Sequence, residues 1–135
     1  MNLLVIGDFP ETSKSAKTAD YLDLIHREFP ITKIITFDFS GVYSEARVWA
    51  YDKDIPSVMY EASKAKTPPN KPGHCPNQFL RKVVDDYHVD GFLFVFIDND
   101  RDKSHHRSKI RSFFRRSMKA FKRQKVFSNK KYAGM

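Results

Sequence analysis

The stretch FLFVFI at residues 92–97 is the most apolar run of the chain, and it lies between Gly91 and the polar triplet Asp98-Asn99-Asp100. Consecutive apolar residues without polar alternation are typical of a strand that is buried on both faces, as in a parallel sheet. We therefore expect residues 92–97 to form a central strand of such a sheet.

Short apolar runs alternate with longer segments of helical periodicity along the rest of the chain, which is the pattern of βαβ units. The alternation predicts one Rossmann-like α/β domain over residues 1–128. We expect three layers, with about five mostly parallel strands in the order 3-2-1-4-5 and helices on both faces of the sheet. The expected strands are residues 3–6, 31–37, 57–60, 92–97 and 125–128. The expected helices run from about 15 to 29, 42 to 50, 76 to 87 and 101 to 123.

Composition is consistent with one folded domain. The chain has 135 residues, of which 41% are hydrophobic and 14% aromatic, enough to build a single core. The apolar run at residues 3–6 is too short to span a membrane, and Cys75 is the single cysteine, which excludes an internal disulfide. We expect a cytoplasmic protein that has no membrane partner.

The C-terminal part of the chain is strongly basic. Residues 101–135 contain 13 of the 24 Lys and Arg residues, with Asp102 as the single acidic residue among them. An apolar stripe along the same expected helix, ending at Phe121, would pack on the body of the domain and leave the cations exposed. Such a surface attracts the phosphates of RNA, DNA or nucleotides, although many charge runs are merely solvated helix faces. The candidate polyanion-binding residues are Arg107, Arg111, Arg115, Arg116, Lys119, Lys122 and Arg123, and residues 129–135 are expected to form a basic tail.

Polar segments follow three of the expected strands, at residues 7–12, 38–41 and 98–100. Open parallel sheets bind ligands at the carboxyl ends of strands, where the strand order reverses. Glycines there let a ligand approach the backbone, and hydroxyls at helix starts favour phosphate. The same residue types are also common in turns and helix caps. The candidate ligand-binding residues are Gly7, Asp8, Thr12, Ser40, Gly41 and Asn99.

Aspartates at the strand ends raise the alternative of an enzyme. Asp98 and Asp100 are two residues apart, which directs both side chains to one side if strand geometry continues. Together with Asp8 they would bind Mg²⁺ and act as the catalytic residues of a phosphoesterase or nuclease. The competing interpretation is that they cap the following helix.

Several landmarks occur in a characteristic order. A glycine-containing turn follows the first strand, Gly41 leads into a helix that ends near Trp49-Ala50, an Asp54-Ile55-Pro56 turn follows, and Asn77 precedes a hydrophobic helix. This layout, from Met1 to about Phe127, resembles the SLOG superfamily, the Rossmann-like domains related to the DprA/SMF and LOG proteins, and especially its small stand-alone bacterial and phage members. The resemblance implies a nucleotide pocket over the carboxyl edge of the sheet.

The chain departs from the family pattern where glycine pairs usually stand. Phe37-Asp38 replaces the pair after the second strand, and Asp98-Asn99-Asp100 replaces the pair after the fourth. This acidic triplet also resembles the acidic pair of TOPRIM-type metal-dependent domains, in which the first strand ends in Glu rather than in Gly7-Asp8.

Three hypotheses follow from the sequence. The first is a module that binds a nucleotide or nucleic-acid phosphates with the strand-end crevice and the basic helix. The second is the Mg²⁺-dependent enzyme, and the third is a phage or mobile-element protein that binds a host protein. Tyr43 and Trp49 are considered for stacking on a base, although the periodicity around Trp49 favours burial.

Overall fold

The computed structural model describes residues 1–7, 17–39, 41–61, 76–95, 115, 119 and 121–129, without the side chains of residues 76–80. It contains a five-stranded sheet in the order β3-β2-β1-β4-β5, in which every neighbouring pair is parallel. The strands are β1 (Asn2–Gly7), β2 (Lys33–Phe37), β3 (Ser57–Tyr60), β4 (Gly91–Val95) and β5 (Lys125–Ser128). The expected Rossmann-like strand order is therefore confirmed.

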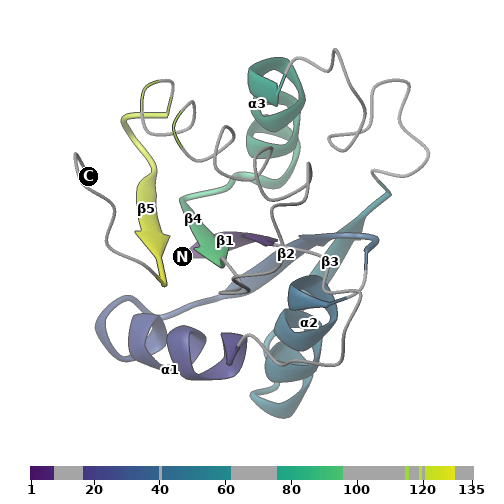
Figure 1. Ribbon diagram of the computed structural model, residues 1–135, viewed down its shortest axis with the longest axis vertical. Helices are drawn as coiled ribbons and strands as arrows, with labels where there is room; N and C mark the ends of the chain where they lie inside the picture. The colour runs from purple at the N-terminus through teal and green to yellow at the C-terminus, as the bar shows by residue number, and fades with distance from the viewer. Residues whose placement is uncertain are drawn as a thin grey trace, which may run out of the picture.

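Among the fully described elements, three helices pack on the two faces of this sheet (Figure 1). They are α1 (Thr18–Glu28), α2 (Val42–Asp52) and α3 (Pro76–Tyr87). Helices α1 and α2 lie on one face and α3 lies on the other, which confirms the expected three-layer arrangement.

The alternation of side chains along β1 builds both halves of the core. Leu3 and Val5 belong to the cluster beneath α1 and α2, whereas Leu4 and Ile6 belong to the cluster beneath α3. Successive residues of a strand point to opposite faces, so an unbroken apolar run is needed to fill both layers. The strand β4 is buried along its whole length, and its apolar residues from Phe92 onward likewise fill both layers of the core.

Some boundaries differ from the expectations. Helix α1 begins at Thr18 rather than near Ser15, after Lys17 in the left-handed conformation (φ 54°). Strand β2 begins at Lys33 rather than Ile31, because the backbone N–H of Ile31 donates to His26 Nδ1 at 2.9 Å and is held in the turn that follows α1. The end of the expected strand at residues 96–97 lies outside the described residues.

Phe121 attaches the basic C-terminal segment to the body of the domain. Its side chain is 4% exposed, and its ring lies 5.3 Å from that of Phe92. The burial predicted for Phe121 is confirmed, while the rest of the expected apolar stripe lies outside the described residues. In the part of the chain that the structure describes, no helix is long and apolar enough to cross a membrane.

Candidate functional site

Two predicted ligand-binding glycines lie at the carboxyl edge of the sheet, and each has a structural reason to be glycine. A Cβ on Gly7 would lie 2.6 Å from Cγ1 of the buried Val42, so Gly7 lets the first turn of α2 sit directly against β1. Gly41 precedes α2 with φ 72° and ψ −126°, a conformation that side chains disfavour. The ligand-binding role of both residues stays a prediction.

The first turn of α1 already has a negative charge beside it. The backbone N–H of Thr18 donates to Glu45 Oε2 at 3.4 Å, which brings a carboxylate of α2 to the amino end of α1. Anions are favoured at this end of a helix because of its unpaired N–H groups and its dipole. A phosphate at this end of α1 would lie beside Glu45, so the described part of the carboxyl edge is poorly suited to it.

Arg47, on α2, is a cation at the same edge, and its terminal nitrogens donate hydrogen bonds to acceptors of the protein itself. Nη1 donates to Thr36 Oγ1 and to the Phe37 carbonyl, both at 2.9 Å. Nη2 donates to the Phe39 carbonyl at 3.0 Å and to Ser44 Oγ at 3.2 Å. Burial lowers the pKa of Arg47, and nearby Asp38 partly opposes this shift. Arg47 therefore holds the end of β2 and the chain after it to α2.

The structure buries both aromatic side chains that were considered for base stacking. Tyr43 is 1% exposed and packs with Phe37 and Phe39, each ring centroid 5.7 Å from its own. Trp49 is 4% exposed, and its Nε1–H donates to Asp23 Oδ1 at 2.8 Å. The stacking hypothesis is therefore wrong for both residues, because neither ring has a free face.

Several predicted site residues lie outside the described residues. Among the described residues, no group of three or more potential metal ligands occurs. The Mg²⁺ site and the catalytic aspartates therefore stay predictions. The residues concerned are Asp8, Thr12, Ser40, Asp98, Asn99 and Asp100, which were expected after the strand ends, and Arg107, Arg111 and Arg116, which were expected in a basic helix.

Four of the predicted polyanion-binding residues are described, and all four are exposed. Arg115 and Lys119 are in helical conformation, and Lys122 and Arg123 follow in the turn before β5. Lys125, the first residue of β5, is exposed as well. We call these five residues the basic segment: Arg115, Lys119, Lys122, Arg123 and Lys125.

The cations of the basic segment are available to a ligand. Within the described residues, none of the five forms an ion pair with a carboxylate. Phe121, in the middle of the segment, is buried in the core. The segment thus combines an apolar anchor with outward cations. The helix expected to continue to about residue 123 does not include residues 121–124, because Phe121 enters the core and the chain turns there into β5.

Sequence reasoning missed Arg47 and Glu45 as organisers of the carboxyl edge. Both lie on α2 among residues whose periodicity indicates only which face is apolar. Their position in the sequence could have indicated this role, because both lie within the first two turns of a helix that follows a strand. A long side chain at such a position can reach the neighbouring loop.

Comparison of the chain with protein-family models, with curated proteins and with solved structures finds no match. The resemblance to the SLOG superfamily therefore depends only on the residues quoted for it above.

Proposed function

We propose that this protein binds nucleic acid through phosphate contacts made by the basic segment. The observation that carries the proposal is that all five described cations between residues 115 and 125 are exposed while Phe121, among them, is buried. A cationic surface fixed to a folded body binds phosphates mainly by releasing condensed counterions, so the interaction depends strongly on salt.

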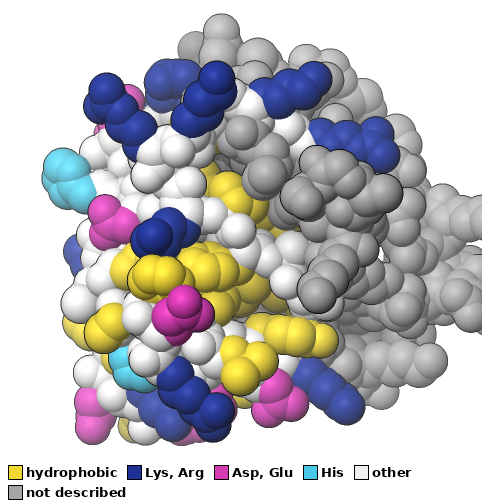
Figure 2. Space-filling view, turned by 90° about the vertical axis from the view of Figure 1, so that its left-hand side faces the viewer, with side chains coloured by type: hydrophobic (Ala, Val, Ile, Leu, Met, Phe, Trp, Pro, Cys, Tyr) yellow, Lys and Arg dark blue, Asp and Glu magenta, His cyan; other side chains and the backbone are white. Residues whose placement is uncertain are grey.

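The spacing of the cations favours a chain of phosphates over a single anion. Arg115 and Lys119 are both exposed and in helical conformation, and they are four residues apart in the sequence. Lys122, Arg123 and Lys125 continue the series toward the start of β5. Figure 2 shows Lys and Arg side chains along the upper rim of this side of the molecule. A polyanion following this rim would meet several cations in succession.

The carboxyl edge gives less support to phosphate binding in its described part. Glu45 adds a negative charge beside α1, and the terminal nitrogens of Arg47 are bonded to the protein. A nucleotide pocket at that edge, as implied by the SLOG resemblance, is a separate prediction. The Mg²⁺-dependent enzyme and the host-protein partner likewise have no described observation that favours them.

The test is a fluorescence-anisotropy titration of the full chain with labelled RNA and DNA. If all five cations contact phosphates, the logarithm of the binding constant should fall against the logarithm of salt with a slope of about −3.5 for a single strand, because each contact contributes about −0.7. Charge reversal by Lys119→Glu/Lys122→Glu should weaken binding at least tenfold, an order-of-magnitude expectation for losing two contacts and adding repulsion.

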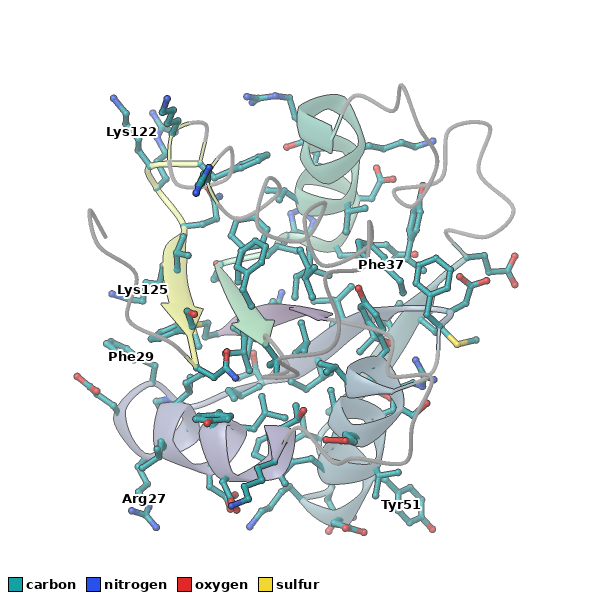
Figure 3. All side chains as sticks on the ribbon, in the orientation of Figure 1. Arg27, Phe29, Phe37, Tyr51, Lys122 and Lys125 are labelled. Atoms are coloured by element: carbon teal, nitrogen blue, oxygen red, sulfur yellow. The ribbon has the colours of Figure 1, made fainter. Side chains whose placement is uncertain are left out.

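The matched control is Arg27→Glu/Lys82→Glu, which makes the same change in net charge at exposed positions on α1 and α3. Figure 3 shows Arg27 and Lys122 at opposite ends of the molecule. The proposal predicts that the control variant binds much more tightly than the basic-segment variant. Equal affinities for the two variants, or no binding by the unaltered protein at low salt, would contradict it.

A further inference from the structure

A groove opens at the amino-terminal edge of the sheet, opposite the edge where the sequence predicted a ligand. It has a volume of about 530 Å³ and is formed by the chain leaving α1, the chain entering β4 and the chain entering β5. Small-molecule sites commonly have volumes of about 300–1,000 Å³, so this groove is large enough for one nucleotide. Its lining includes Phe29, Asp90, Arg123 and Lys125.

Phe29 contributes an aromatic ring that the fold holds in place. The side chain is half-buried, and its ring packs against Phe127 with 5.8 Å between centroids and an interplanar angle of 52°. The ammonium of Lys125 lies 4.4 Å from the centroid of the Phe29 ring, a cation–π contact. Figure 3 shows the two labelled side chains side by side at the start of β5.

The groove has a positive balance of charge. Arg123 and Lys125 form no ion pair with a carboxylate among the described residues. The carboxylate of Asp90 is bonded to the protein itself, because its Oδ2 accepts the backbone N–H of Asn2 at 2.8 Å. The groove therefore favours an anion near Arg123 and Lys125, next to an aromatic ring.

These features occur together on one face of the molecule. Figure 2 shows hydrophobic side chains gathered in the middle of this face, a basic side chain lying over them, and further basic side chains along the rim above. A cationic track beside an aromatic platform is the arrangement by which many proteins bind single-stranded nucleic acid.

We propose that the groove binds one nucleotide of a single-stranded nucleic acid, with its base on the ring of Phe29 and its phosphate between Arg123 and Lys125. The inference depends on the proposed function and specifies the strand form that the protein prefers. Lys125 would exchange its contact with the ring for a contact with phosphate. A duplex cannot use Phe29 in this way, because its base faces are already stacked on one another.

The experiment compares labelled single-stranded RNA and DNA with a duplex of the same sequence, by anisotropy, on the full chain. Phe29→Leu keeps an apolar side chain beside Phe127 and removes the stacking surface. It should weaken single-strand binding about fivefold or more, as expected for the loss of one stacked base, and leave duplex binding unchanged. Phe29→Tyr keeps the ring and should bind single strands like the unaltered protein.

A second variant tests the phosphate contacts. Arg123→Gln/Lys125→Gln should make the single-strand salt slope less negative by about 1.4, since each phosphate contact contributes about 0.7. The matched control, Arg27→Gln/Lys82→Gln, removes the same charge from α1 and α3 and should leave the slope unchanged. Urea unfolding of each variant checks that the fold is retained.

The outcomes separate this inference from the proposed function. If the unaltered protein binds no nucleic acid in a salt-sensitive manner, the proposed function fails, and this inference with it. If Lys119→Glu/Lys122→Glu weakens binding while Phe29→Leu and Arg123→Gln/Lys125→Gln bind as the unaltered protein does, the groove is excluded and the phosphate contacts are confined to the other cations of the basic segment. Duplex binding as tight as single-strand binding would also overturn the inference. A different outcome would assign the groove to an acidic protein segment instead. In that case, binding of a labelled polyglutamate peptide would be lost in Arg123→Gln/Lys125→Gln, while binding of the oligonucleotides would be unchanged.

Discussion

Replacement of Gly7 by alanine should destabilise the protein because α2 lies too close to β1 for a methyl group. A Cβ at this position would be 2.6, 2.7 and 2.8 Å from Cγ1, Cβ and Cγ2 of Val42. Carbon atoms in good contact are about 3.5–4.0 Å apart, so the shortfall is about 1 Å. A new rotamer of Val42 cannot remove it, because the Cβ of Val42 is fixed to the backbone. The first turn of α2 must therefore move.

We expect the free energy of unfolding to fall by about 1–3 kcal/mol in Gly7→Ala, the usual cost of overpacking a core. Relief of the entropic cost of glycine in a strand, about 0.5–1 kcal/mol, offsets part of the clash. A domain of ordinary stability, about 5–15 kcal/mol, would still fold. Urea unfolding followed by the fluorescence of Trp49, the single tryptophan, measures the change.

Gly91→Ala is the matched control in β4. A Cβ on Gly91 would lie 3.1 Å from Sδ of Met1, the flexible part of a side chain that can move away, and 3.3 Å from the Lys125 carbonyl oxygen. We expect it to change stability much less than Gly7→Ala. The double variant Gly7→Ala/Val42→Ala should be less destabilised than the sum of its single changes, by about 0.5–3 kcal/mol. Unaltered stability of Gly7→Ala, or strict additivity with Val42→Ala, would refute the packing argument.

Two further predictions concern polar contacts of the helices. Arg47→Met should lower the free energy of unfolding by about 2–4 kcal/mol, because four charge-assisted hydrogen bonds are lost from a half-exposed site. In urea unfolding, Arg47→Lys should recover only part of this stability, because an ammonium group cannot reproduce the planar set of donors of a guanidinium. Full recovery by lysine would contradict a specific role for the guanidinium group. The hydrogen bond from Trp49 lowers the pKa of Asp23 below its ordinary value of 3.8, and Lys53 adds to this effect. The ionised Asp23 should therefore contribute a little stability at pH values above 3.8, and this contribution is lost as the pH falls through the lowered pKa. In thermal unfolding, Asp23→Asn should lack this loss of stability in acid. The same dependence of stability on pH in Asp23→Asn and in the unaltered protein would contradict the prediction.

The strand order could be predicted because it depends on simple patterns. The apolar runs at residues 3–6 and 92–97 are too continuous for strands with a solvated face, and their described residues lie in the inner neighbours β1 and β4 (Gly91–Val95). The shorter strand β3 (Ser57–Tyr60) lies at the edge of the sheet, and its alternate residues Ser57 and Met59 are exposed. Burial of the inner strands thus leaves a direct trace in the sequence, whereas the exposed Met59 shows that the edge position of β3 does not.

The contacts of α2 could not be predicted by the same reasoning. Periodicity assigned Val42 and Trp49 to the core, but Tyr43 is buried too, in the other core layer, with Phe37 and Phe39. This happens because the first turn of α2 crosses the carboxyl edge of the sheet, and residues there can reach either face. Helical periodicity describes one face of a regular helix and contains no information about such an edge.

The groove at the amino edge was missed for a different reason. The rule for parallel sheets directs attention to the carboxyl ends of strands, whereas Phe29, Asp90 and Lys125 come from three connections that meet at the other edge. Their proximity follows from the strand order β1-β4-β5 together with the end of α1. In a parallel sheet, the residues that precede neighbouring strands meet at one edge, just as the residues that follow the strands meet at the other.

Phosphate binding by the basic segment can be tested by measuring the salt dependence of single-stranded RNA and DNA binding for the unaltered protein and for Lys119→Glu/Lys122→Glu. We expect binding to weaken steeply between about 50 and 200 mM salt. The charge-reversed variant should bind at least tenfold more weakly, on the order of the loss expected for two phosphate contacts. Binding that is insensitive to salt, or unaffected by these two substitutions, would contradict the claim that the basic segment binds nucleic acid.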